Sequence, residues 1–123
     1  VVIDEWRRPW NAKPDKPVRD VPASHFWASD KRGFGQVGCI YTAQGFEYDW
    51  SGVILGDDFV RRGETWVARR GYSFDGQVRK AAEREFPALV RNTYKVLLTR
   101  GMKATAVFST DLETQEFLER MCR

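Results

Sequence analysis

The sequence predicts a three-layer α/β domain with a short, mostly parallel sheet. Apolar runs with little alternation, which are typical of strands buried on both faces, occur at residues 37–41, 51–55 and 104–108. Patterns typical of helices lie between or after these runs, at residues 76–85, 88–100 and beyond 110. Because strands that alternate with helices form parallel sheets, we expect the functional residues at the carboxyl ends of the strands.

The amino-terminal part is expected to be rich in loops. Residues 1–3 could form a short buried strand, and prolines at positions 9, 14, 17 and 22 predict a surface loop. Ser24 could open a short helix over residues 23–30, which a turn at 31–35 would end. We therefore expect one domain, in which a loop-rich part (1–35) precedes a core that carries the motifs (36–123).

The core elements follow from their start and stop signals. Gln44 and Gly45 predict a tight turn after the first strand, and the second strand would end at Gly56. A hairpin within residues 59–72 is expected as part of an insertion spanning 57–74. The remaining signals are Asp75 and Pro87 at helix starts, Gly101 as a helix stop, and Thr110 or Asp111 as the cap of a final amphipathic helix.

Composition excludes several classes of protein. The chain has 123 residues, of which 42% are hydrophobic and 14% aromatic, so it is not a disordered segment. A net charge of +3 permits an anionic partner without requiring one. Cys39 and Cys122 are expected to be free thiols, and with one histidine they cannot form a zinc site. No transmembrane run or signal peptide is present, which predicts a soluble, cytoplasmic protein. We expect no metal site in the chain itself.

The segment from Gly38 to Asp49 combines an apolar run with small and polar residues. Gly45 permits a backbone conformation that other residues resist, and the Glu47 carboxylate could accept hydrogen bonds from sugar hydroxyls. The alternative is an ordinary strand–turn–strand in which Glu47 is only solvated.

Arg100 is the second candidate, at the end of the expected helix 88–100. We expect Arg100 to lie beside the carboxyl end of a strand, where a buried arginine suits an anion. An arginine finger at a transferring phosphoryl group accelerates hydrolysis by about 10³–10⁵. The alternative is a cation favoured by the dipole at the carboxyl end of a helix.

Both segments resemble the last two motifs of superfamily 1 helicases. The first motif has the form [Thr/Ser]-x-[His/Tyr]-x-x-[Lys/Gln]-Gly-x-Glu, here with Cys39 in place of Thr or Ser, followed by Tyr41, Gln44, Gly45 and Glu47. The second ends in Leu-Leu-Thr99-Arg100, with Arg91 resembling an upstream supporting arginine. Over residues 36–119, and also 6–11, the amino-acid sequence is similar to the predicted bacterial DNA/RNA helicases related to the Schlafen helicase-like domain.

The resemblance implies a set of site residues. Arg100 would be the catalytic arginine finger at the γ-phosphate of ATP, and Glu47 would hold the ribose. Gln44, Gly45, Arg91 and Thr99 would belong to the nucleotide site, while Tyr41 and Thr42 would lie near the nucleic-acid backbone.

The resemblance also implies a second RecA-like domain of the P-loop NTPase superfamily. No Gly-x-x-x-x-Gly-Lys-[Ser/Thr] loop occurs in the sequence, and the chain starts with Val1, so we expect a fragment of a longer motor. An amino-terminal RecA-like domain of the same parent chain would bind ATP and Mg²⁺, and DNA or RNA would be the track. The parent is expected to be an ATP-dependent helicase or translocase, and the isolated chain is expected to be inactive.

Four other interpretations remain open. Val1–Glu5 has the form of a Mg²⁺-binding strand that ends in Asp-Glu, although solvated acids at a strand end are more common. Asp57 and Asp58 could belong to a stand-alone nuclease, but no carboxylate–x–lysine pattern accompanies them. The arginines at 61, 62, 69 and 70 could contact phosphates or form a solvated face. Finally, the chain could be a non-catalytic interaction module for nucleic acid or protein that keeps the motor fold.

Overall fold

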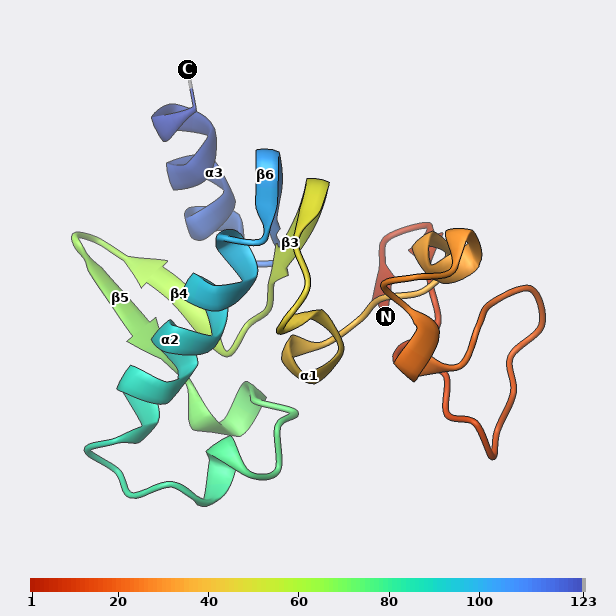
Figure 1. Ribbon diagram of the computed structural model, residues 1–123. Coiled ribbons are helices and arrows are strands. Elements are labelled where there is room, and N and C mark those ends of the chain that lie inside the picture. Colours follow the sequence, from red (N-terminus) through yellow and green to blue (C-terminus); the bar gives the residue numbers. More distant parts are fainter. Residues whose placement is uncertain (123) are drawn as a thin grey trace. The chain divides into compact units, whose positions relative to one another are not determined.

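A computed structural model describes residues 1–122 of the chain (Figure 1). They form two compact units, the first spanning Val1–Phe46 and the second beginning at Glu47. The first unit holds strands β1 (Val2–Ile3) and β2 (Trp6–Arg7), 3₁₀ turns at Ser24–Phe26 and Lys31–Gly35, and helix α1 (Ile40–Ala43). The second holds β3 (Tyr48–Leu55), β4 (Phe59–Arg62), β5 (Thr65–Ala68), 3₁₀ turns at Arg70–Tyr72 and Val78–Lys80, α2 (Phe86–Leu98), β6 (Gly101–Ser109) and α3 (Leu112–Met121).

The first unit begins with a hairpin. Strand β1 pairs antiparallel with β2, so Asp4 and Glu5 occupy the turn between them, where Asp4 has a φ of 49°. Both carboxylates are exposed to solvent. Asp4 and Glu5 thus lie in a hairpin turn of an antiparallel pair rather than at the end of a buried parallel strand, which favours the interpretation as solvated acids.

A buried glutamine fastens the proline-rich loop of the first unit. Gln36 is 4% exposed, and its Oε1 accepts a hydrogen bond from the backbone N–H of Ala12 at 2.7 Å. Its Nε2 donates to the carbonyl of Pro22 at 2.6 Å. Since a buried amide is costly unless its groups are paired, these bonds hold residues 12–22 to the rest of the unit.

The prediction of a strand at residues 37–41 is wrong. Only Val37 forms a bridge, to Trp10, and residues 40–43 form the single helical turn α1. The turn starts at Cys39, whose backbone N–H donates to Thr42 Oγ1 at 2.8 Å while the Thr42 hydroxyl donates to Cys39 O at 2.9 Å. This local pairing of Cys39 with Thr42 satisfies groups that a strand would have paired with a neighbour.

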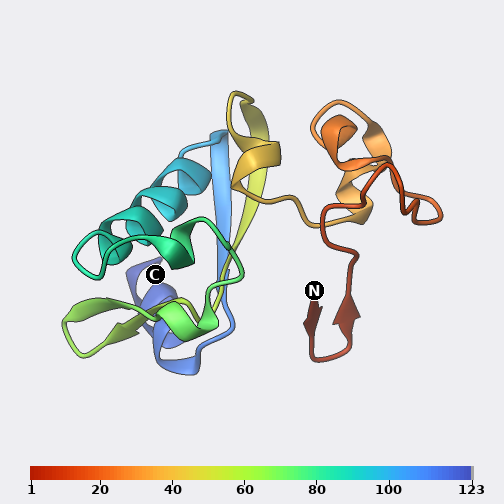
Figure 2. The same cartoon turned by 90° about the horizontal axis from the view of Figure 1, so that it is seen from below.

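The parallel pairing predicted from the sequence is confirmed in the second unit. Strand β3 pairs in parallel with β6, and Val53 lies opposite Val107 in the register. Figure 2 shows the two strands side by side. Both strands start earlier than predicted, at Tyr48 and Gly101, and these starting residues pair with each other.

The core of the second unit lies between the sheet and the helices. Its buried residues are Val53, Leu55, Phe59, Phe86, Val90 and Tyr94, with Leu97 of α2 and Leu118 of α3 packed against them. The opposite face of the β3–β6 pair carries Trp50 and Phe108, which are 69% and 39% exposed. Among the described residues, α2 and α3 therefore cover one face of this sheet.

The two longer helices confirm the predictions, with shifted bounds. Pro87 stands in the first turn of α2, where its missing N–H costs no hydrogen bond. At α3 the cap is Asp111, whose Oδ2 accepts from the N–H of Thr114 at 3.0 Å. This bond decides between the two caps that the sequence left open.

The prediction of a helix at residues 76–85 is wrong. The Asp75 carboxylate accepts from the N–H groups of Gln77 and Val78, which produces a short 3₁₀ turn at Val78–Lys80. Ala81 then turns extended, with φ −61° and ψ 153°. A longer helix here would have little apolar surface to bury, because Val78 is the only large apolar residue between Asp75 and Phe86.

Candidate functional site

The amino ends of the two parallel strands bring two predicted site residues together. The backbone N–H of Tyr48 donates to the carbonyl of Arg100 at 2.9 Å, which joins the residue after Glu47 to the residue before β6. Glu47 is exposed and Arg100 is half-buried. We call Glu47, Tyr48, Thr99, Arg100 and Gly101 the amino edge.

The expectation that Arg100 lies beside the carboxyl end of a strand is wrong. Helix α2 ends at Leu98 and runs directly into β6 through Thr99 and Arg100. In a parallel arrangement the helix returns the chain to the start of the next strand, so a residue at this junction lies at the amino end. The carboxyl ends of β3 and β6 lie at the opposite end of the sheet.

The Arg100 side chain is held against the end of α2. Its Nε donates to the carbonyl of Val96 at 3.1 Å, and an Nη lies 3.4 Å from Thr99 Oγ1. The Thr99 hydroxyl donates to the carbonyls of Lys95 and Val96 at 3.0 Å each. These contacts cap the last turn and fix where the guanidinium lies; the dipole of the helix also favours a cation here.

The Tyr48 phenol lies close enough to Arg100 to feel its positive charge. Burial raises the pKa of the Tyr48 phenol, and the positive charge of Arg100 acts in the opposite direction. The phenol therefore stays neutral at physiological pH. Tyr48 thus adds an aromatic hydroxyl to the amino edge, which also carries the Glu47 carboxylate and the Arg100 guanidinium.

Gly101 makes the tight start of β6 possible. A Cβ at this position would lie 2.4 Å from the carbonyl oxygen of Ala104 and 2.9 Å from Ser51 Oγ. The Ser51 and Thr105 hydroxyls are hydrogen-bonded to each other at 2.9 Å in the same place. Any side chain at 101 would therefore displace the turn that carries Arg100.

The remaining motif residues lie in the first unit. Tyr41 is 59% exposed on α1, whereas the Thr42 hydroxyl is engaged at the start of that helix. Gln44 and Gly45 follow α1, and Gly45 has a φ of +84°, a conformation that suits glycine. The structure thus groups Tyr41, Thr42, Gln44 and Gly45 in one unit and Glu47, Thr99 and Arg100 in the other.

Cys39 stands where the helicase motif usually has Thr or Ser, and the structure gives it a partner. The Nδ2 of Asn11 donates to its Sγ at 2.9 Å. The Thr42 hydroxyl donates to the side-chain Oδ1 of Asn11 at 3.4 Å. The thiol therefore takes part in the local polar cluster that opens α1, which links the early Trp6–Asn11 segment to the motif.

Arg91 lies away from the amino edge. It lines a groove of about 470 Å³ between β5 and the first turns of α2, together with Trp66 and Arg84. Nine positions separate Arg91 from Arg100, which is roughly 13 Å along a helix. The structure therefore does not bring Arg91 to the amino edge, and sequence reasoning missed Trp66 and Arg84 as its neighbours.

The aspartates at the carboxyl ends of the strands are bound within the fold. The Tyr94 hydroxyl donates to Asp58 Oδ1 at 2.6 Å and accepts from the N–H of Gly56 at 3.1 Å. Burial raises the pKa of Asp58, and burial together with the Asp58 charge raises that of Tyr94. Asp57 accepts from the Thr110 hydroxyl at 3.1 Å. Each of these aspartates thus has a structural partner.

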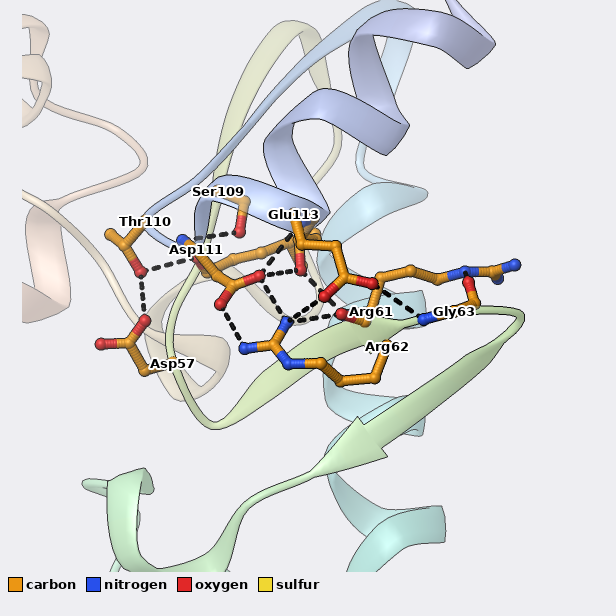
Figure 3. Close-up of polar contacts among 10 residues, drawn as sticks. Asp57, Arg61, Arg62, Gly63, Ser109, Thr110, Asp111 and Glu113 are labelled. Carbon is orange, nitrogen blue, oxygen red and sulfur yellow. Dashed lines mark hydrogen bonds and ion pairs between the residues drawn. The ribbon is translucent and has the colours of Figure 1, made fainter.

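A second cluster ties the β4–β5 hairpin to α3 (Figure 3). Arg62 donates two hydrogen bonds to the carboxylate of Asp111, at 2.8 and 2.6 Å, and forms an ion pair with Glu113 at 3.4 Å. Glu113 also accepts from the N–H of Gly63 at 2.8 Å. Hydrogen bonds from Arg62 lower the pKa of Asp111 well below its usual range. We call this cluster the hairpin clamp.

The four hairpin arginines are all engaged internally. Arg61 lies over the ring of Phe117 at 4.3 Å, and Arg69 lies over that of Tyr72 at 3.7 Å. Arg70 donates to the carbonyl of Ala81 at 2.9 Å and to Glu83 at 3.2 Å. With Arg62 in the hairpin clamp, these side chains hold the hairpin and its flanking turns rather than forming a free basic surface.

Comparison with known proteins decides the family. The family described as "Schlafen group 3, DNA/RNA helicase domain" matches residues 1–111. The chain belongs to this family. It is also 31% identical over 103 residues to the uncharacterized protein YPL245W of Saccharomyces cerevisiae, a match covering 76% of this chain and 22% of the relative.

The match spans only about a fifth of the yeast relative's length. No solved structure matches the chain. Among residues 1–122, no helix combines the length and the apolar character that crossing a bilayer requires. Membership of the family makes a helicase-related role the starting point for any account of function.

Proposed function

We propose that this domain is the carboxyl-terminal motor half of an ATP-dependent DNA/RNA helicase or translocase, with a RecA-like fold and a cytoplasmic location. The observation that supports the proposal is the amino edge, where the backbone hydrogen bond from Tyr48 to Arg100 brings the chain next to Glu47 and the chain at Arg100 together. A ribose and a phosphate of one nucleotide need such a pair of groups.

Glu47, Thr99 and Arg100 of the amino edge each have a defined task in this proposal. The Glu47 carboxylate accepts hydrogen bonds from the ribose hydroxyls, and the Arg100 guanidinium neutralises charge that develops on the γ-phosphate. Thr99 holds Arg100 by closing the last turn of α2. Gln44 and Gly45, which precede Glu47 in the sequence, complete the nucleotide contacts, and Tyr41 and Thr42 contact the nucleic-acid backbone.

The phosphate loop and Mg²⁺ belong, in this proposal, to an amino-terminal RecA-like domain of the same parent protein. Loss of the γ-phosphate would remove the partner of Arg100 and let the two domains separate while nucleic acid stays bound. Because Arg100 alone cannot bind ATP and Mg²⁺, the isolated chain is expected to be inactive.

The proposal is tested in the parent protein by replacing Arg100 with glutamine. We expect single-turnover ATP hydrolysis to fall by about 10³-fold, because the transition-state charge loses its guanidinium. Binding of ATP should change far less. Arg120→Gln is the matched control, since Arg120 is an exposed arginine near the end of α3. Hydrolysis that is equally fast in both variants would contradict the proposal.

A second candidate is a non-catalytic interaction module that keeps the motor fold. The bond from Arg100 to Val96 O favours it, because a helix cap alone accounts for an arginine at this place. In that case Arg100→Gln would lower the melting temperature of the domain and leave ATP hydrolysis by the parent unchanged.

A further inference from the structure

The outer side of α2 carries cations that have no partner among residues 1–122. Arg84, Arg91 and Lys95 are exposed, and their side chains make no hydrogen bond or ion pair with any described residue. Arg91 and Lys95 are four residues apart and lie on one side of α2, and Arg84 stands in the turn just before the helix. We call this row the α2 stripe.

The α2 stripe differs from the hairpin arginines in the charge around it. Arg62 and Arg70 each face a carboxylate. By contrast, the residues that line the groove at Arg84 and Arg91 include no acidic side chain. Two guanidinium groups at one groove without a counter-charge produce a positive potential that favours an anion.

The groove beside the stripe also has an aromatic wall. Trp66 of β5 lines it and is 38% exposed. Its ring stacks on Phe59 at 5.0 Å between centroids, and the Arg61 guanidinium lies over the same ring at 5.9 Å from the centroid. Phe117 meets the Trp66 ring edge-on, at 5.9 Å. The indole is therefore fixed in orientation by its neighbours, and its exposed part gives the groove an aromatic wall.

The volume of the groove fits a single nucleotide unit. It measures about 470 Å³ and is lined by residues of β5 and of the first turns of α2. Small-ligand sites of ~300–1,000 Å³ are typical. Thr65 adds a hydroxyl to the lining, and Pro87 and Ala88 leave the floor apolar.

We propose that the α2 stripe, together with the groove at Trp66, binds single-stranded nucleic acid. A base packs in the groove against the exposed part of Trp66, while Arg84 and Arg91 hold the phosphates on either side of it and Lys95 holds a further one. Arginine suits this task because its planar fork binds phosphate through two hydrogen bonds. The surface is separate from the amino edge, so binding does not require ATP.

An acidic peptide is the main alternative occupant, and the aromatic wall argues against it. A carboxylate-rich chain gains from the stripe but not from an aromatic wall, whereas every nucleotide offers both a phosphate and a base. The test must therefore separate the effect of charge from that of contact with the aromatic wall.

The experiment measures binding of a fluorescein-labelled oligothymidylate of about 16 nucleotides to the full 123-residue chain by anisotropy. Salt is varied from about 50 to about 200 mM without ATP. We expect the double variant Arg84→Gln/Arg91→Gln to bind at least about tenfold more weakly. The slope of log affinity against log salt should fall by about 1.4, since each single-strand phosphate contact contributes about 0.7.

Ala88→Glu provides a second variant that is expected to fold. Ala88 is the third residue of α2, where a carboxylate is favoured by the helix dipole. The new side chain enters the groove and adds a negative charge, so oligothymidylate binding should be lost. Ala88→Gln, of equal size but neutral, should retain more of the affinity than Ala88→Glu.

Arg120→Gln controls for net charge and should leave the affinity within about twofold of the wild type. Several results would overturn the proposal: no binding by the wild type, wild-type affinity in the Arg84/Arg91 double variant or in Ala88→Glu, or an equal loss in Arg120→Gln. Competition by polyglutamate as effective as that by unlabelled oligothymidylate would assign the surface to an acidic protein instead. Failure of the ATP-site proposal would change none of these results.

Discussion

The two ends of the β3–β6 pair use their polar residues in different ways. At the carboxyl ends, Asp58 is bound by Tyr94 and Asp57 by Thr110, and the adjoining hairpin clamp pairs Arg62 with Asp111. At the amino edge, Glu47 is exposed and Arg100 is placed by the end of α2. The carboxyl end, where α/β proteins usually carry their sites, is here consolidated by contacts within the domain.

This difference shows that chain direction matters more than the general rule for α/β sheets. A helix that leads into a strand delivers its last residues to the amino end of that strand, and Arg100 is such a residue. The order of elements along the chain, with Thr99 and Arg100 between a helix and a strand, therefore already implied that Arg100 lies at the amino end of β6. Three substitutions test this comparison of the two ends of the sheet through their effect on stability, and they follow from the largest expected effect to the smallest.

Gly101→Ala should disrupt the amino edge. The added Cβ would lie 2.4 Å from the Ala104 carbonyl, which is backbone and cannot move without breaking the strand. We expect the free energy of unfolding to fall by about 3 kcal/mol, at the upper end of overpacking effects. Gly52→Ala is the control, because a Cβ there meets nothing within 4 Å. Denaturant unfolding monitored by circular dichroism measures both, and equal stability of the two variants would refute the close-packing argument.

Tyr94→Phe should weaken the carboxyl end. Removing the hydroxyl leaves the Gly56 N–H and the Asp58 carboxylate without their shared partner. An unsatisfied buried group costs about 1–3 kcal/mol, so we expect a loss of about 2 kcal/mol in chemical denaturation. Asp58→Asn combined with Tyr94→Phe completes a double-mutant cycle. A coupling energy near zero would show that the pair is incidental.

Asp111→Asn tests the hairpin clamp through pH. The pKa of Asp111 is lowered in the folded state, so its contribution is complete above the unfolded value near ~4 and is lost as the pH falls below it. The variant should be less stable than the wild type by about 1 kcal/mol at neutral pH, where it loses the charge that pairs with Arg62 and caps α3. The difference should shrink as the solution is acidified. A difference that is independent of pH would mean that the carboxylate charge contributes nothing.

Elements with strong local signals were predicted well from the sequence. The wide apolar arc ending at Gly101 predicted α2, and the unbroken apolar runs predicted β3 and β6 with their parallel pairing. Their bounds moved by up to three residues because pairing with a neighbour, rather than residue type, decides where a strand starts. The hairpin was recognised from loose alternation around Gly63, which has a φ of +57°.

The errors came where a side chain competes with secondary structure. Thr42 and Asp75 each bind nearby backbone groups, and the result is a helical turn where we expected a strand and a 3₁₀ turn where we expected a helix. The partners of the hairpin arginines could not be predicted either. Arg62 and Asp111 are 49 positions apart, so their pairing follows from packing and not from any pattern along the chain.

The measurement that tests the central claim most directly is photocrosslinking of the parent protein with an ATP analogue that carries a photoreactive group on its γ-phosphate. Peptide mapping then shows which end of the sheet meets the nucleotide. The account predicts label on the peptide that contains Thr99 and Arg100, lost on competition with unlabelled ATP. Label on the peptides that contain Asp57 and Asp58, or Thr110 and Asp111, would place the nucleotide at the carboxyl ends and contradict the account.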